Sequence, residues 1–271
     1  MIKLLLIWTI GLLPIITFSQ SQNDQNNIVE PIKRIINTLN KIEPEENVFN
    51  NGYDSIPYRL VYPVRQIQTE KYPLLVYLHG MGTRGKDNQK PLEKFSVFFS
   101  DSTTANKFPC YILIPQCPEN DVWVSFPDFP NSLSTSAEPT HAAQSVLALI
   151  KHFIETKNID TNRVYLTGFS MGGEGTFDLL ARESKLFACG VPLASVADTS
   201  KANLIKNIPV WAFHGSDDKI NNVKYSRIMI EEIKKNGGNP IYSELKGEGH
   251  DCRNFVYLNE QLWICVFKQH K

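Results

Sequence analysis

Short apolar runs recur along the chain at intervals that suit strands of a buried sheet. Runs of this kind, typical of strands buried on both faces, lie at 72–78, 111–115, 163–166, 188–193 and 209–213, and a last strand is expected at 241–245. Residues 58–64 instead alternate between apolar and polar positions and are bounded by Pro57 and Pro63, which indicates an edge strand.

The segments between these runs show apolar residues at helical spacing. Helices are expected from about 138, where Val146, Ile150 and Phe153 fall on one stripe, and over 171–181, 223–235 and 254–267. Strands that alternate with helices of this length predict an α/β domain with a mostly parallel sheet and helices on both faces. In such sheets the active loops lie at the carboxyl ends of the strands.

The first 19 residues have the pattern of a signal peptide. Lys3 precedes an apolar stretch from Leu4 to Ile16, and Thr17 and Ser19 are small residues before Gln20. The apolar stretch is shorter than the roughly 20 residues of a membrane span. We therefore expect cleavage and export, periplasmic or extracellular, with an uncleaved N-terminal anchor as the alternative.

Residues 20–54 are expected to form a polar leader with a short amphipathic helix over 28–42, ahead of a catalytic domain at 55–271. Removal of residues 1–19 leaves 27 basic against 28 acidic residues, which gives no argument for nucleic acid or an anionic membrane as partner. About 250 residues, with 42% hydrophobic positions in the whole chain, suit one α/β domain. The oligomeric state is left open.

Five cysteines, an odd number, leave at least one free thiol in an exported protein. Cys110 with Cys117, and Cys252 with Cys265, are close enough in sequence to bridge, whereas Cys189 lies in an apolar run and is expected to be a buried thiol. The connectivity stays open. No cysteine and histidine spacing typical of zinc appears, and neither a metal nor a cofactor is expected.

The stretch Gly168-Phe169-Ser170-Met171-Gly172 fits the G-x-S-x-G nucleophile elbow at a turn from strand to helix. A serine nucleophile in this setting requires an acid and then a histidine later in the chain. His250, in a glycine-rich loop after the last strand, is the candidate base. Asp218 is the candidate acid, with Asp217 as the first alternative and Asp198 as a more distant one.

Two backbone N–H groups are expected to form an oxyanion hole. One belongs to Met171, directly after the serine, and the other to Met81 in the glycine-rich loop after the strand at 72–78. His79 precedes Ser170 in the chain and is expected to shape this loop by hydrogen bonding, and His214 is interpreted as structural.

The loop after the strand at 111–115 carries Trp123, Phe126 and Phe129. These side chains are candidates for an acyl or aryl pocket above Ser170, and ordinary packing under a long loop is the alternative.

Several of these segments resemble secreted α/β-hydrolases of the phospholipase/carboxylesterase type, often labelled predicted peptidases and similar to feruloyl-esterase and polyhydroxybutyrate-depolymerase-like enzymes. The resemblance rests on 72–85, 114–118 with Trp123, 168–173, 213–218 and 249–250, and extends from about residue 55 to the end. It implies the α/β-hydrolase fold and a triad of Ser170, Asp218 and His250. Thr83, where an acidic residue is expected, and Glu174, which adds a charge near the leaving-group side, depart from the pattern.

The expected activity is hydrolysis of carboxylic esters through an acyl-enzyme, on a small-molecule or polysaccharide-linked ester such as a feruloyl or acetyl decoration. A serine peptidase of the same fold is the alternative, and a non-catalytic binding protein comes third.

Overall fold

The structure is a computed structural model that describes residues 42–52, 54–92 and 99–271. The predicted signal peptide, and all of the predicted leader helix except Ile42, lie outside the described residues. No helix in the described part of the chain has the length and apolar character needed to cross a bilayer.

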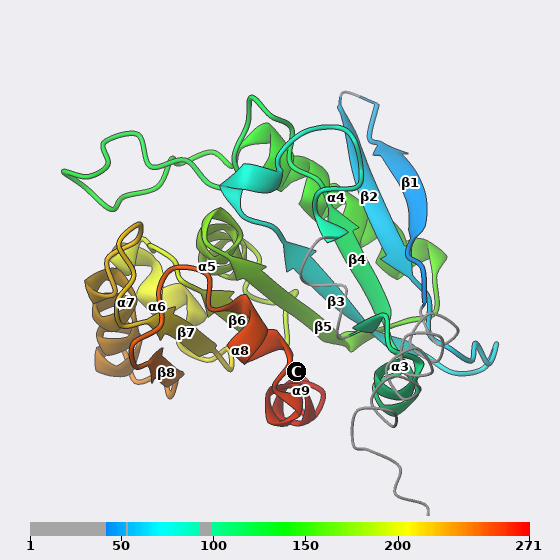
Figure 1. The fold of residues 1–271 in the computed structure, drawn as a ribbon. Coiled ribbons are helices and arrows are strands. Elements are labelled where there is room, and N and C mark those ends of the chain that lie inside the picture. Colours follow the sequence, from blue (N-terminus) through cyan, green and yellow to red (C-terminus); the bar gives the residue numbers. More distant parts are fainter. Residues whose placement is uncertain (1–41, 53, 93–98) are drawn as a thin grey trace, which may run out of the picture. The chain divides into compact units, whose positions relative to one another are not determined.

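Within the described residues the backbone forms one eight-stranded sheet with the strand order β1-β2-β4-β3-β5-β6-β7-β8 (Figure 1). The strands are β1 (Glu45–Asn50), β2 (Ser55–Val61), β3 (Tyr72–Leu78), β4 (Tyr111–Pro115), β5 (Ile159–Phe169), β6 (Cys189–Leu193), β7 (Trp211–Gly215) and β8 (Ile241–Leu245). The β1/β2 and β2/β4 pairs are antiparallel and the other pairs are parallel. The prediction of a mostly parallel sheet is confirmed.

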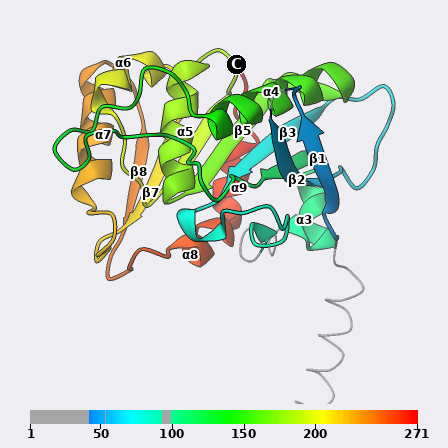
Figure 2. The ribbon, with the colours of Figure 1, turned by 90° about the horizontal axis from the view of Figure 1, so that it is seen from above.

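Helices cover both faces of this sheet. They are η1 (Met81–Thr83), α3 (Ser102–Lys107), α4 (His141–Thr156), α5 (Met171–Arg182), η2 (Thr199–Lys201), α6 (Ala202–Ile205), α7 (Lys224–Lys235), α8 (Arg253–Tyr257) and α9 (Glu260–Val266). Figure 2 shows α4, α5, α6 and α7 on one side of the sheet and α3, α8 and α9 on the other.

The buried strands contribute alternate side chains to two separate cores. In β3, Leu74, Val76 and Leu78 join the cluster formed with α4, α5 and α7, whereas Leu75 and Tyr77 join the cluster formed with α8 and α9. Because side chains alternate between the faces of a strand, a sheet covered on both sides requires apolar residues at every position. This is why β3 and β4 appear in the sequence as unbroken apolar runs.

The strand at the edge of the sheet was not predicted. β1 pairs with β2 from Glu45 opposite Leu60 to Asn50 opposite Ser55, so β2 is an inner strand. The prediction of an edge strand at 58–64 is therefore wrong, and residues 45–50, which precede the predicted domain start at residue 55, pair with the sheet. The residues of β1 are exposed or half-buried, and its polar sequence gives no apolar run to recognise.

The C-terminal segment differs from the single helix predicted over 254–267. Asn259 interrupts it: the Asn259 side chain accepts a hydrogen bond of 3.0 Å from the Gln261 N–H and thereby caps a new helix, α9. The short helix α3 was not predicted either. β5 (Ile159–Phe169) is longer at both ends than the predicted run at 163–166. β7 (Trp211–Gly215) begins and ends two residues later than the predicted run at 209–213.

All five cysteines are free thiols in the structure. Neither of the two bridges that sequence proximity allows is present, and Cys189 is buried as predicted. Burial raises the pKa of Cys117 and of Cys252 to about 12, so these thiols stay protonated.

Arg59 on β2 fastens the edge strand to the rest of the domain. Its buried guanidinium donates to the carbonyl of Asn88 at 2.6 Å and to that of Pro44 at 3.2 Å. It also pairs with the half-exposed carboxylate of Glu46 on β1 at 2.8 Å. Both carbonyl groups belong to buried residues, where water does not replace a lost donor. Removal of the guanidinium would therefore leave them unsatisfied and lower the stability of the fold.

We predict that Arg59→Met lowers the free energy of unfolding by about 2–4 kcal/mol, because it leaves buried carbonyl groups without donors. Glu46→Gln is the matched control and is expected to cost less than about 1 kcal/mol, since its carboxylate faces solvent. Urea unfolding followed by circular dichroism measures both values. Equal losses for the two variants would contradict the anchoring role of Arg59.

Candidate active site

Ser170 lies at the turn between β5 and α5 and has an unusual backbone conformation. Its φ is 55° and its ψ is −121°, a combination that costs energy for a residue with a Cβ. The surrounding backbone holds it there: the Ser170 N–H donates to the Leu193 carbonyl at 2.9 Å, and the Glu174 N–H donates to the Ser170 carbonyl at 2.9 Å. The result is a hydroxyl raised above the carboxyl edge of the sheet.

Two glycines make this turn possible. A Cβ on Gly172 would lie 1.9 Å from the Leu78 carbonyl oxygen, and one on Gly168 would lie 2.2 Å from the Gly172 carbonyl oxygen. No side chain fits at such distances, so only glycine lets the first turn of α5 approach the end of β3.

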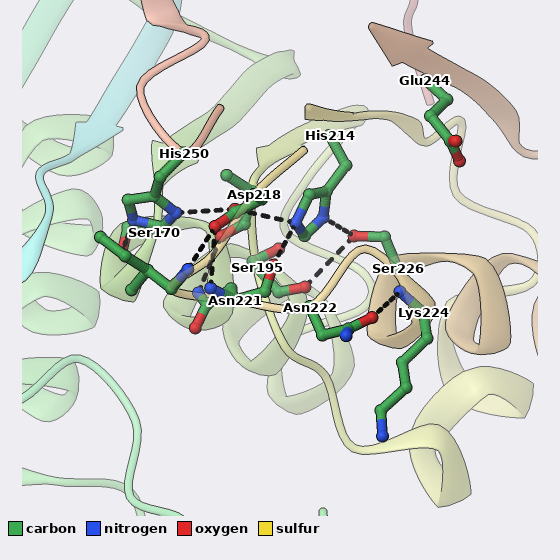
Figure 3. Close-up of polar contacts among 12 residues, drawn as sticks. Ser170, Ser195, His214, Asp218, Asn221, Asn222, Lys224, Ser226, Glu244 and His250 are labelled. Carbon is green, nitrogen blue, oxygen red and sulfur yellow. Dashed lines mark hydrogen bonds and ion pairs between the residues drawn. The ribbon is translucent and has the colours of Figure 1, made fainter. Parts of the chain in front are cut away.

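His250 and Asp218 come to Ser170 from the loops after β8 and β7. The His250 Nε2 lies 2.9 Å from the Ser170 Oγ, and the His250 Nδ1 lies 2.7 Å from the Asp218 Oδ2 (Figure 3). Because the ionised carboxylate can only accept, Nδ1 carries the proton, and the lone pair of Nε2 faces the serine hydroxyl. The structure thus brings together the three residues that the sequence singled out.

The carboxylate of Asp218 is buried and accepts hydrogen bonds at both oxygens. Its Oδ1 accepts from the N–H groups of Ile220 at 2.8 Å and Asn221 at 2.9 Å, and its Oδ2 accepts from His250 and from the His214 Nε2 at 3.0 Å. The alternative acid, Asp217, is exposed. Its carboxylate accepts from the Ser216 hydroxyl and its N–H donates to the Glu248 carbonyl, and neither contact involves His250.

His214 extends this series of contacts into the core. Its Nε2 also lies 2.8 Å from the Asn221 carbonyl oxygen, so Nε2 carries the proton, and its Nδ1 lies 2.7 Å from the Ser226 Oγ. Burial lowers the pKa of His214, which favours the neutral ring. A neutral His214 donates to Asp218 and accepts from Ser226, and both contacts are drawn in Figure 3. The structural role predicted for His214 therefore includes holding the carboxylate.

The N–H groups of Met81 and Met171 occupy equivalent positions in two helices. Met81 is the first residue of η1 and Met171 the first residue of α5, where a backbone N–H has no acceptor inside the helix. Both residues line one cavity beside Ser170. Two such donors can bind the oxygen of a tetrahedral intermediate.

His79 fixes the loop that carries Met81. Its Nε2 accepts from the Cys117 N–H at 2.9 Å, so the proton resides on Nδ1, which donates to the Gly80 carbonyl at 2.7 Å. Burial lowers the pKa of His79 to about 4, so the ring stays neutral. This is the loop-shaping role that the sequence predicted.

The cavity beside Ser170 has a volume of about 380 Å³. Its lining is Met81, Val122, Val124, Ser125, Phe126, Phe129, Met171, Glu174, Val196 and Asn221. Phe126 and Phe129 both line this cavity. Trp123 does not: it is fully buried, and its indole N–H donates to the His79 carbonyl at 2.9 Å, so it supports the loop from below and cannot contact a substrate.

The loop that carries these aromatic residues, 116–140, reaches across α5 toward α7 (Figure 2). Arg182 on α5 donates to the carbonyl groups of Ser136 and Ala137, each at 2.7 Å, and the ring of Phe129 lies 6.1 Å from that of Tyr225 on α7. These contacts between distant segments set the far wall of the cavity.

Glu174, one turn into α5, is the one acidic residue of the cavity lining. Its Oε1 accepts from the Asn221 side-chain amide at 3.3 Å. Burial raises the pKa of Glu174 to about 7, although the hydrogen bonds from Asn221 and the Val196 N–H act in the opposite direction. Asn221 and Val196 carry no motif, and the sequence did not identify them.

We predict that Glu174→Gln stabilises the protein at pH 8 but not at pH 4.5. The pKa of Glu174 is higher in the folded state than its ordinary value of 4.5, so ionisation opposes folding increasingly as the pH rises from 4.5 through 7. The expected gain at pH 8 is about 1–3 kcal/mol, measured by urea unfolding. Glu183→Gln at the exposed end of α5 is the control, and a gain at pH 4.5 as large as that at pH 8 would refute the prediction.

Within the described residues no group of three or more histidine, cysteine, aspartate or glutamate side chains could hold a metal ion.

Comparison with known proteins matches residues 63–256 to the phospholipase/carboxylesterase family. A solved structure of a thermostable esterase is 31% identical, with a TM-score of 0.77, and the match covers 86% of this chain and 64% of that one. The prolyl endopeptidase FAP of Bos taurus is 24% identical over 222 residues, which are 80% of this chain and 28% of that protein.

The bifunctional acetylxylan esterase/xylanase XynS20E of Neocallimastix patriciarum is 33% identical over 116 residues, 42% of this chain and 16% of that protein. The matches thus span less than a third of either of these two longer relatives. The family match covers most of this chain, and the eight-stranded sheet agrees with it. The chain therefore has the α/β-hydrolase fold and belongs to the phospholipase/carboxylesterase family.

Proposed function

We propose that this protein is an exported serine esterase that cleaves carboxylic esters through an acyl-enzyme. The observation that carries the proposal is the series of hydrogen bonds from Ser170 through His250 to Asp218, next to the helix-start N–H groups of Met81 and Met171. The proposed export rests on the signal-peptide pattern of residues 1–19, and the proposed domain begins at residue 45 with β1.

In the acylation half-reaction, the Ser170 Oγ attacks the ester carbonyl carbon while its proton passes to the His250 Nε2. The N–H groups of Met81 and Met171 donate to the oxyanion that forms. Asp218 stabilises the imidazolium through its hydrogen bond to Nδ1. Nε2 then returns the proton to the leaving alcohol as the bond from carbon to that oxygen breaks, and the acyl group stays on Ser170.

Deacylation uses the same groups with water as the nucleophile. His250 takes a proton from water, the hydroxide oxygen attacks the acyl carbon, and the proton is returned to the Ser170 Oγ as the acid leaves. No further cofactor takes part in this proposed cycle.

The substrate class that we favour is an acyl ester of a polysaccharide, feruloyl or acetyl. It is supported by the similarity to an acetylxylan esterase and by the aromatic residues Phe126 and Phe129 in the cavity. Serine peptidase activity is the second candidate, and the similarity to a prolyl endopeptidase favours it. The same Ser170, His250 and Asp218 would serve both reactions.

We predict that a fluorophosphonate probe labels Ser170 and that the protein hydrolyses 4-nitrophenyl acetate or methyl ferulate. Ser170→Ala should abolish labelling and reduce kcat by about 10⁴-fold or more, because it removes the nucleophile but no buried contact of the core. Mass spectrometry of the labelled peptide and initial rates give both readouts. Turnover of a peptide panel without ester turnover would support the peptidase, and an unlabelled, inactive protein would refute the enzyme proposal.

The acid is tested by comparing two adjacent aspartates. Asp218→Asn is expected to lower kcat by about 10⁴-fold, because the amide no longer fixes the productive tautomer of His250. Asp217→Asn is the matched control and should stay within about two-fold of the wild-type rate, since this exposed side chain contacts Ser216. Circular dichroism checks that both variants fold. The reverse ranking would transfer the acid role to Asp217.

A further inference from the structure

The cavity beside Ser170 combines an apolar wall with one carboxyl group. Val122, Val124, Phe126, Phe129 and Val196 contribute apolar surface, and Glu174 and Asn221 lie among them. A carboxyl group in such surroundings is costly unless it has a specific partner. The proposed reaction uses neither the carboxyl of Glu174 nor the amide of Asn221, so their presence requires another explanation.

Among the described residues, Glu174 has no ion-pair partner of opposite charge. The basic residues that approach α5 form ion pairs with Asp178 instead, Arg182 at 2.6 Å and Lys201 at 2.7 Å. The contacts of Glu174 are hydrogen bonds from neutral donors, the Asn221 amide at 3.3 Å and the Val196 N–H. The Asn221 amide is itself held by a bond of 2.9 Å to the Ala194 carbonyl. The carboxyl is therefore fixed in place with capacity left to accept from a ligand.

Glu174 is also close to the reaction centre. It follows Ser170 by four residues on α5, and its N–H donates to the Ser170 carbonyl at 2.9 Å. Ser170 is the N-cap of α5 and Glu174 lies in its first turn, where four residues of helix rise about 6 Å along the axis. A group attached to the ester carbonyl or to its alcohol oxygen can thus reach the carboxyl while the carbonyl carbon is at Ser170.

We infer that Glu174 is a specificity-determining residue that, supported by Asn221, accepts a hydrogen bond from a hydroxyl group on a ring of the bound ester. The inference rests on the proposed function and names the recognition group of that same site. Phe126 and Phe129, with ring centroids 6.5 Å apart, supply the apolar surface for the ring itself.

A hydroxyl group suits this carboxyl better than a cation does. Near neutral pH both the protonated and the ionised form of Glu174 are populated, because its pKa is about 7. A hydroxyl can donate to the carboxylate and accept from the carboxylic acid, whereas an ammonium has no lone pair and cannot accept the O–H of the carboxylic acid. A glutamine side chain at this position would accept the hydrogen bond from the hydroxyl more weakly than the ionised carboxylate does.

Two series of matched esters test the inference. The acyl series consists of methyl 3-arylpropanoates with methyl, hydroxyl or aminomethyl at the para position. The alcohol series consists of acetates of cyclohexylmethanol with methyl or hydroxyl at position 4. The first series represents a phenolic acyl group and the second a saturated, sugar-like alcohol, so the two sources of a hydroxyl are separated.

The full-length protein should prefer the hydroxyl ester over its methyl analogue by about 10- to 100-fold in kcat/KM in one of the two series. Glu174→Leu should reduce this ratio to about one, mainly by weakening turnover of the hydroxyl ester. Glu174→Gln, which keeps an acceptor oxygen, should retain part of the preference. Glu183→Gln at the other end of α5 serves as a control and should leave the ratio unchanged.

Because the readout is a ratio between two substrates of one protein sample, a general loss of folded protein does not change it. An equal ratio in wild type and Glu174→Leu would overturn the inference while turnover of the methyl esters upheld the esterase. A preference for the aminomethyl ester that disappears in Glu174→Gln would overturn it in favour of a cationic substrate. Failure of every ester in both series would overturn the inference together with the esterase proposal.

Discussion

The close approach of α5 to the carboxyl end of β3 is the constraint on which the site depends. The backbone of Gly172 packs so closely against the Leu78 carbonyl that a Cβ would lie 1.9 Å from that oxygen. This contact brings the start of α5 next to the loop that begins at His79. Met171 at that start and Met81 in that loop line the same cavity, and Ser170 just before α5 has a strained backbone conformation.

The second requirement of the site is a buried carboxylate held in position against the imidazole of His250. Asp218 meets it with four donors: two backbone N–H groups of its own loop, His250, and His214 at the end of β7. A buried carboxylate surrounded by donors costs less than an unpaired one, and its geometry is fixed before a substrate binds. The core around β7 thus supports the catalytic imidazole through a second histidine that never touches the substrate in the proposed mechanism.

Glu174 differs from Asp218 in the number and kind of groups that surround its carboxyl group. It has two neutral donors and no cation among the described residues, and its elevated pKa of about 7 reflects that difference. A carboxyl group that is predicted to oppose folding near neutral pH and that lies close to Ser170 is typical of a site where function and stability compete. The two carboxyl groups, both near Ser170, are thus suited to different tasks by their surroundings.

The order and type of the elements follow from the sequence, because a sheet covered on both faces requires unbroken apolar strands and amphipathic helices. The apolar runs located β3 and β4, and the glycine pattern singled out Ser170. The order of acid and base along the chain then pointed to Asp218 and His250. The polar strand β1 and the break at Asn259 were missed, since an exposed edge strand and a helix cap within an apolar segment leave little periodicity to detect.

Tertiary structure alone decided which side chains face the cavity. Trp123 and Phe126 are three residues apart in one aromatic loop, yet the first is buried beneath His79 and the second lines the cavity. Asn221 and Val196 meet Glu174 from separate loops, and His214 meets Asp218 because the turn after β7 folds back on the strand. Such contacts depend on how loops from different strands pack against each other, and local sequence does not encode that packing. The sequence by itself therefore determined the fold and singled out Ser170 as the candidate nucleophile, and the folded loops determined the cavity.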